Sequence, residues 1–146
     1  MAAIRRATVK WTGNLMNGSG VLTADTSGAF ANLPVTWASR TESADGKTSP
    51  EELLASAHAS CYSMAFSSDL TKAGTPPESL VVTSEISLDR VDGKMTVISS
   101  KLIVHGHVAG LEQARFRELA AAAKDGCPIS RALAGNVALS VEATLD

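Results

Sequence analysis

The sequence lacks a long apolar run, an excess of basic residues and a series of cysteines, and each absence excludes a class of protein. No apolar stretch reaches the roughly 18 residues that a membrane-spanning helix needs. The formal net charge is −2, so we expect no polybasic surface and no nucleic-acid partner. Residues 1–6 lead directly into a strand-like pattern and not into a signal peptide, so we expect a cytosolic protein.

Only two cysteines occur, Cys61 and Cys127, and they lie far apart in the sequence. In a cytosolic protein such a pair does not predict a structural disulfide framework. The two residues are therefore either inert thiols in the core or a working redox pair. Their number and spacing leave both alternatives open.

Length and composition predict one domain over residues 1–146. Hydrophobic residues make up 45% of the chain and charged residues 19%, which is typical of globular proteins. A chain of this length can bury a sizeable core. We find no internal repeat, low-complexity tract or linker that would divide it.

The segment from Ser49 to Gly74 carries its own helix start and stop signals. Ser49 and Glu52 form an S-x-x-E capping box, and Pro50 occupies the first helical position, where its missing N–H costs nothing. Gly74 supplies the left-handed residue that ends a helix. We predict a helix of about 35 Å. Its middle is mostly Ala and Ser around Cys61, so we expect it to be buried on most sides.

Alternating patterns on either side of this helix predict six strands and a second helix. The strands are predicted over Ala7–Trp11, Gly20–Thr23, Val35–Ser39, Leu80–Asp89, Met95–Val108 and Val137–Leu145, with turns at Asn17-Gly18 and Asp92-Gly93. The second helix is predicted over Leu111–Asp125, and a helical turn over Pro128–Leu133. The order βββ-α-ββ-α-β indicates an α+β fold with antiparallel sheets and helices packed on one side.

Two of these segments predict which side chains face the core. On Met95–Val108 we expect Ile98, Leu102 and Val104 to point inward and His105 and His107 to point outward. Two outward histidines could bind a metal, but without a third ligand they favour a solvated strand face. On the second helix we expect one face to hold Leu111, Ala114, Glu118, Leu119 and Ala122.

Cys61 lies in the middle of the long helix, where nothing local can activate it. The effect of the helix dipole fades beyond the first turn, and a buried thiol has a raised pKa. If Cys61 is a nucleophile, a cation must lie beside it. His58 is on the same face, but its Ala and Ser surroundings favour a neutral imidazole. An arginine would serve better, because it stays charged when desolvated.

Cys127, unlike Cys61, lies where local structure can stabilise a thiolate. Gly126 ends one helix and Pro128 begins the next turn, so Cys127 occupies an N-cap position. Backbone amides and the positive helix end would favour its thiolate. Judged by its local surroundings alone, Cys127 is the better nucleophile of the two cysteines. A simple capping or packing role is an equal alternative.

Two segments resemble the signature blocks of the OsmC/Ohr family, the osmotically inducible protein C and organic hydroperoxide resistance proteins. Residues 49–61, S-P-E-E-L-L-A-S-A-H-A-S-C, are similar to the block N-P-E-E-L…A-A-H-A-A-C, with Ser49 in place of Asn. Residues 122–130, A-A-K-D-G-C-P-I-S, are similar to the block A…C-P-[VI]-S. The similarity extends over nearly the whole chain, and the strand motif at Ile86–Asp89 is closer to the OsmC branch.

The resemblance implies an intertwined homodimer and a thiol-dependent peroxidase without a metal or flavin cofactor. By the family's pattern Cys61 is the peroxidatic cysteine and Cys127 the resolving one. This differs from the local electrostatics, which favour Cys127 as the nucleophile. Arg40 and Glu51 are catalytic by the same pattern: Arg40 is the permanent cation, and Glu51 can grip its guanidinium. The implied substrates are organic hydroperoxides and, less well, hydrogen peroxide, in oxidative or osmotic stress defence. The implied reductant is a dithiol of lipoyl type.

Helix geometry constrains where these four residues can meet. Glu51 and Cys61 are ten residues apart, or about 15 Å along a straight helix. We therefore hypothesise that Arg40 and Glu51 of one chain complete a site holding Cys61 and Cys127 of the other. Met64, Phe66 and Leu133 are candidates for its apolar lining, with core packing as their simpler role. The alternative function is a non-catalytic dimeric binding or stress-structural protein with inert core thiols.

Overall fold

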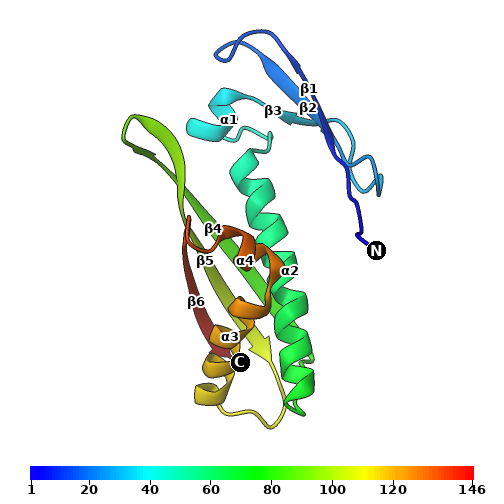
Figure 1. Ribbon diagram of the computed structural model, residues 1–146, viewed down its shortest axis with the longest axis vertical. Helices are drawn as coiled ribbons and strands as arrows, with labels where there is room; N and C mark the ends of the chain where they lie inside the picture. Colours follow the sequence, from blue (N-terminus) through cyan, green and yellow to red (C-terminus); the bar gives the residue numbers. More distant parts are fainter. The chain divides into compact units, whose positions relative to one another are not determined.

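The computed structural model describes residues 1–146 and has an α+β fold with two three-stranded sheets and one long helix (Figure 1). The chain separates into two compact units, Met1–Leu53 and Leu54–Asp146, each with one of the sheets. A single domain over residues 1–146 stays a prediction. None of the helices has the length and apolar character required to cross a bilayer.

The first unit contains an antiparallel sheet of β1 (Thr8–Thr12), β2 (Ser19–Thr23) and β3 (Leu33–Val35). The predicted first hairpin is present, but a longer loop at 13–18 replaces the tight Asn17-Gly18 turn. The third strand also ends earlier than expected. Thr36 and Ser39 form a reciprocal capping box that starts helix α1 (Trp37–Thr41), because side-chain caps satisfy the free amides of a first turn.

Helix α2 (Pro50–Lys72) begins and ends where the sequence signals predict. The Glu52 amide donates to Ser49 Oγ at 3.1 Å, and Gly74 has a φ of +83°. The helix is less buried than predicted. One stripe at four-residue spacing is fully buried, and the opposite stripe is exposed; the buried residues are His58, Tyr62, Phe66 and Leu70, the exposed ones Ser56, Ser60, Met64 and Ser68.

The second unit contains β4 (Ser79–Val91), β5 (Lys94–His107) and β6 (Ala138–Leu145). The β4–β5 hairpin is antiparallel, as predicted, and turns at Asp92-Gly93. Strand β6 instead pairs with β5 in parallel, which corrects the expectation of purely antiparallel sheets. The reason is the crossover through α3 (Gln113–Gly126) and α4 (Pro128–Leu133), which returns the chain to the end where β5 began.

A bulge in β5 corrects one predicted inward residue. Ser87 pairs with Ser99 and Leu88 with Val97, so Ile98 is the extra residue between them. An extra residue in one strand shifts the alternation of its side chains. Ile98 is exposed as a result, whereas Leu102 and Val104 are buried as predicted.

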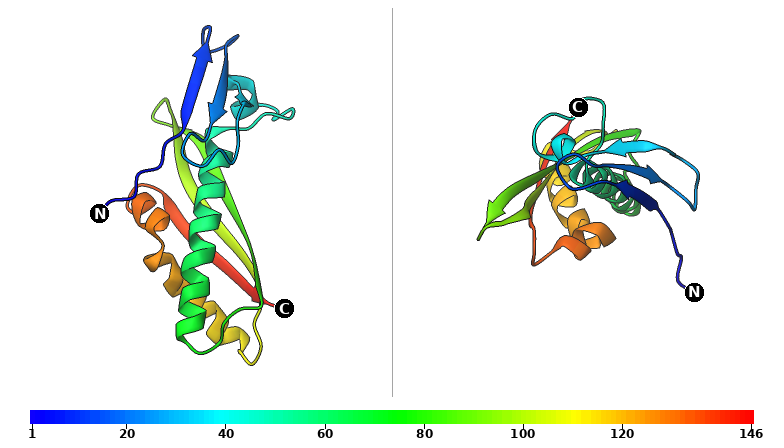
Figure 2. Two further views of the ribbon diagram at one scale, coloured as in Figure 1. Left: turned by 90° about the vertical axis from the view of Figure 1, so that its right-hand side faces the viewer. Right: turned by 90° about the horizontal axis from the view of Figure 1, so that it is seen from above.

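The core of the second unit lies between its sheet and its helices, which cover one face of that sheet (Figure 2). Tyr62, Phe66 and Leu70 of α2 pack there with residues of β5 and α3. The face predicted for α3 is correct only in part: Leu111 and Leu119 pack against the core, but the fully buried positions are Phe116, Ala120 and Ala123. The single aromatic ring decides the orientation of this Ala-rich helix, because burying a phenyl ring outweighs burying several methyl groups.

Candidate active site

Cys61 and Cys127 lie together in the second unit. Cys61 is in the middle of α2 and partly buried, and Cys127 is fully buried at the junction of α3 and α4. Both are free thiols, and their side chains are hydrogen-bonded to each other. The fold thus brings two cysteines from distant parts of the sequence into direct contact.

Cys127 caps the N-terminus of α4. Its sulfur accepts a hydrogen bond from the Ser130 amide at 3.5 Å, and Pro128 follows as the first helical residue. Burial acts to raise the pKa of Cys127, but hydrogen bonds from the Ser130 amide and hydroxyl, the Cys61 thiol and the Ile129 amide outweigh it. The pKa of Cys127 is therefore lower than that of an ordinary cysteine.

Cys61 has the opposite electrostatic environment. Burial raises its pKa, the neighbouring Cys127 raises it further, and only the Ile129 amide opposes them. Within one chain the shared proton thus stays on Cys61, and Cys127 is the better thiolate. This is the order of acidity expected from the local sequence, so activation of Cys61 requires a group from elsewhere.

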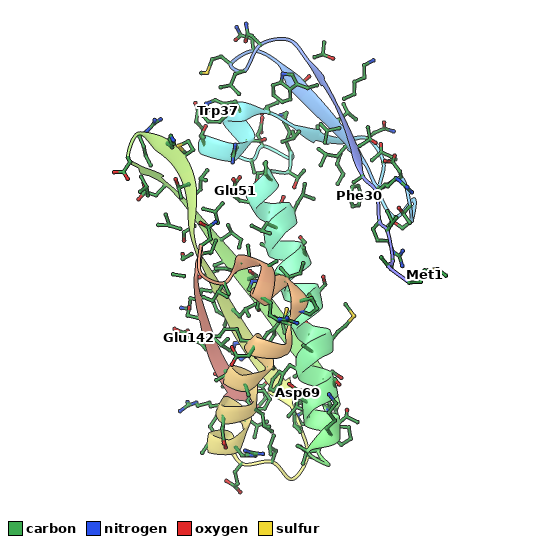
Figure 3. The ribbon with its side chains drawn as sticks, in the orientation of Figure 1. Met1, Phe30, Trp37, Glu51, Asp69 and Glu142 are labelled. Atoms are coloured by element: carbon green, nitrogen blue, oxygen red, sulfur yellow. The ribbon has the colours of Figure 1, made fainter.

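Arg40 and Glu51 form a bidentate ion pair in the first unit. Arg40 Nη2 donates to Glu51 Oε1 at 2.7 Å, and Arg40 Nε donates to both carboxylate oxygens, at 2.9 and 3.2 Å. Arg40 lies on α1. Glu51, labelled in Figure 3, lies on the first turn of α2. Trp37 packs its ring 5.8 Å from the guanidinium carbon. The pair and the ring hold the Arg40 side chain in one orientation.

An apolar cavity of about 370 Å³ opens beside Arg40 within the first unit. Its walls include Val9, Trp11, Leu15, Val35, Trp37 and Leu53. The three residues suggested as an apolar lining are elsewhere: Phe66 is in the core of the second unit, Met64 is exposed and Leu133 is half-buried on α4. Trp37 was not predicted from the sequence, although its place three residues before Arg40 on a capped segment was a usable signal.

His58 is fully buried and accepts or donates a hydrogen bond at each ring nitrogen. Nδ1 lies 2.7 Å from Ser100 Oγ, and Nε2 lies 2.7 Å from Ser130 Oγ. Burial lowers the pKa of His58, so the ring is neutral, as the sequence suggested. Its hydrogen bonds are to the serines of β5 and α4, and Ser130 also contacts the Cys127 sulfur.

The two outward histidines of β5 lie among carboxylates and not in a metal cluster. His105 is 3.7 Å from Asp146, and His107 is 3.4 Å from Glu78. Nowhere do three or more His, Cys, Asp or Glu side chains come together as possible metal ligands. Each histidine thus has its own carboxylate partner on the solvated face.

These observations define a class of α+β protein with a contacting pair of thiols in one unit and a clamped arginine in the other. The family model for OsmC-like proteins matches residues 43–142, and the chain belongs to this family. It is 33% identical to the Escherichia coli protein "Peroxiredoxin OsmC" over 142 residues, which cover 97% of this chain and 98% of the relative.

Solved structures agree with the fold. The organic hydroperoxide resistance protein OhrB of Bacillus subtilis superposes with a TM-score of 0.75 at 24% identity, covering 95% of this chain and 98% of that one. An organic hydroperoxide resistance protein OsmC from Legionella pneumophila gives a TM-score of 0.69 at 28% identity, covering 98% of this chain and 99% of that one. The expected α+β fold and family are thus confirmed, apart from the parallel pairing of β6, and the homodimer stays a prediction.

Proposed function

We propose that this protein is a thiol-dependent peroxidase that reduces organic hydroperoxides, and less efficiently hydrogen peroxide, to alcohols or water. The contact between the Cys61 and Cys127 thiols carries the proposal, because a peroxidase of this type needs a second thiol within reach of the oxidised one. The 33% identity to "Peroxiredoxin OsmC" supports the same activity. Oxidative or osmotic stress defence is the corresponding role.

The reaction begins at Cys61. Its thiolate attacks the distal oxygen of the hydroperoxide, the O–O bond breaks, and the released alkoxide takes up a proton to become the alcohol. Cys61 is left as a sulfenic acid. Cys127 then condenses with it to give the Cys61–Cys127 disulfide and water. Reduction by an external dithiol, which we propose to be of lipoyl type, restores both thiols.

Arg40 supplies the charge that Cys61 lacks in its own surroundings. The Cys61 pKa is raised by burial, so a nearby permanent cation is needed to hold its thiolate and the charge that develops on the peroxide. Glu51 keeps the guanidinium in place through the bidentate pair. Because ten residues of helix separate Glu51 from Cys61, we propose that Arg40 and Glu51 come from the second chain of a homodimer.

The apolar cavity beside Arg40 suits the organic part of a hydroperoxide. Its two tryptophans and aliphatic side chains would bury an alkyl or aryl group, while the guanidinium faces the peroxide oxygens. Hydrogen peroxide has no group to fill this space. The preference for organic substrates follows from that difference, and the proposed setting is the cytosol.

The decisive experiment is mass spectrometry after one equivalent of an alkyl hydroperoxide. A Cys61–Cys127 disulfide with stoichiometric alcohol supports the peroxidase. Two unreacted thiols would instead support the competing role as a non-catalytic binding or structural protein, which the raised pKa of Cys61 favours as long as one chain acts alone.

A mixed dimer tests the shared site. Combining an Arg40→Ala chain with a Cys61→Ser chain leaves one complete site if Arg40 acts across the dimer, and none if it acts within its own chain. We expect about half the specific activity of the wild-type dimer in isolated heterodimers. Inactive heterodimers would contradict the shared site. They would not contradict the proposed reaction of Cys61 with the hydroperoxide.

A further inference from the structure

A buried hydrogen-bonded chain ends at the Cys127 sulfur, and the proposed reaction does not yet use it. His58 of α2 lies at its centre, 2.7 Å from Ser100 of β5 on one side and 2.7 Å from Ser130 of α4 on the other. Ser84 of β4 continues the chain, with its Oγ 3.2 Å from Ser100 Oγ. His58, Ser100 and Ser130 are at most 1% exposed. Buried polar groups in such a chain have no water to replace a lost partner.

Hydrogen-bond accounting gives the chain two possible directions. A neutral imidazole has one N–H donor and one acceptor. In the first direction Ser84 donates to Ser100, Ser100 donates to His58 Nδ1, and His58 Nε2–H donates to Ser130 Oγ. The Ser130 hydroxyl proton is then free to point at Cys127 Sγ. In the reverse direction the Ser130 proton is used on His58, and its oxygen can only accept from a Cys127 thiol.

The two directions therefore match two forms of Cys127. The first supplies a donor to the thiolate, and the second accepts the proton of the thiol. Tyr62 also interacts with Cys127, but its hydroxyl donates to the Ala120 carbonyl at 2.5 Å and so does not donate to the sulfur. The remaining titratable neighbour is Cys61, whose thiol also reaches Cys127.

We propose that His58 is a positioning residue for the resolving step: it directs the Ser130 hydroxyl at Cys127 and so stabilises the thiolate there. This inference rests on the proposed peroxidase function. The Cys127 thiolate attacks the sulfur of the Cys61 sulfenic acid, the S–S bond forms and the S–O bond breaks. Hydroxide leaves and takes up a proton to give water. The sulfenic acid is the oxidant of this step and the thiolate its reductant, so no further reagent is required.

The same donor acts in reverse when the disulfide is reduced. A thiolate of an external dithiol that attacks Cys61 Sγ releases Cys127 as the leaving thiolate, and the better stabilised thiolate leaves faster. His58 would thereby favour Cys61 as the sulfur that carries the mixed disulfide. The second thiol of the reductant then releases Cys61.

The test measures thiolate formation by ultraviolet absorbance in a Cys61→Ser background, where Cys127 is the only cysteine. We expect Ser130→Ala and His58→Leu each to raise the Cys127 pKa by about one unit, a tenfold loss of thiolate below it, because a hydrogen bond to a charged group is lost. His58→Gln, which keeps one donor and one acceptor, should recover most of the shift. His107→Gln, an exposed histidine on β5, is the matched control and should leave the pKa unchanged.

Non-additivity separates positioning from a purely structural effect. If His58 acts through Ser130, the double variant His58→Leu/Ser130→Ala should shift the Cys127 pKa no further than Ser130→Ala alone does. A shift in Ser130→Ala with none in His58→Leu would overturn the proposal, and so would full additivity. Should His58→Leu fail to fold, His58→Phe, which also lacks a donor to Ser130 Oγ, takes its place and decides between these outcomes. Thiolate titration needs no peroxidase activity, so failure of the proposed function would be seen separately in the hydroperoxide assay.

Discussion

The surroundings of Cys127 and of Arg40 differ in how much of their chemistry a single chain completes. Around Cys127 each polar group has a partner, the sulfur is fully buried, and a second thiol is in contact. Around Arg40 there is a clamped guanidinium and an open apolar cavity, yet the unit Met1–Leu53 contains no cysteine. One region has the thiols without a cation, and the other has the cation without a thiol.

The sheet of the first unit shows the same contrast. All five residues of β1 are exposed, including Val9 and Trp11, whereas in the sheet of the second unit exposed side chains alternate with buried or partly buried ones. Exposed apolar side chains on a strand favour a further protein surface over them. The comparison therefore explains why we place the complete site in a dimer.

The largest effect should come from the thiols themselves. Cys61→Ser is expected to abolish hydroperoxide turnover, because no sulfenic acid can form there. Cys127→Ser should allow one oxidation per site and then stall or proceed to sulfinic acid. Single-turnover measurement of alcohol release distinguishes the two variants. Equal single-turnover reduction by Cys61→Ser would mean that the more acidic Cys127 is the peroxidatic residue, and the comparison of the two regions would have to be reversed.

Arg40 should show the next largest effect. Arg40→Ala is expected to lower kcat/KM for an alkyl hydroperoxide by about 10²–10³-fold, since it removes a preorganised charge from the transition state. Arg40→Lys keeps the charge but loses the bidentate grip of Glu51, so we expect a smaller loss. Arg117→Ala on α3 is a matched control outside the site. Unchanged kcat/KM in Arg40→Ala would remove the first unit from the mechanism.

Packing in the second unit should be sensitive to a single methyl group. A Cβ at Gly106 of β5 would overlap the Phe116 ring, with Cε2 only 2.7 Å away, and Phe116 is fully buried. We expect Gly106→Ala to lower the free energy of unfolding by about 1–3 kcal/mol through overpacking, measured by chemical denaturation. Gly126→Ala, whose new Cβ would meet nothing within 4 Å, is the control. Equal stability of the two variants would show that the core beside Phe116 yields easily.

The parts of the fold that were predictable are those encoded by neighbouring residues. The bounds of α2 follow from Ser49 and Gly74, and the N-cap position of Cys127 follows from the residues on either side of it. The parallel pairing of β6 and the bulge at Ile98 depend on partners elsewhere in the chain, so no local pattern contains them. The family resemblance named Cys61, Cys127, Arg40 and Glu51 together, which local physics alone would not have done.

The environment of His58 was the part of the site least accessible to sequence reasoning. Its neutral state was predictable from the Ala and Ser residues around it. Its partners were not, because Ser100 and Ser130 lie 42 and 72 positions away in the sequence. Only the folded β5 and α4 bring those hydroxyl groups to the imidazole.

The smallest of the expected effects is on the pH dependence of stability, and it also separates the two regions. Burial lowers the folded-state pKa of His58, so below about pH 6.5 the unfolded chain binds a proton that the folded chain excludes. The free energy of unfolding should therefore fall as the pH falls through this range, by at most about 1.4 kcal/mol per pH unit from this one group, and His58 should contribute no slope above it. Chemical denaturation at pH 7.5 and 5.5 measures the change.

His58→Gln should remove this part of the slope, whereas His107→Gln on the solvated face should keep it. Equal slopes in the wild type and His58→Gln would mean that the buried imidazole accepts a proton without a cost in stability. The hydrogen-bonded chain around His58 would then tolerate a charge as well as the partly exposed Arg40–Glu51 pair of the first unit does.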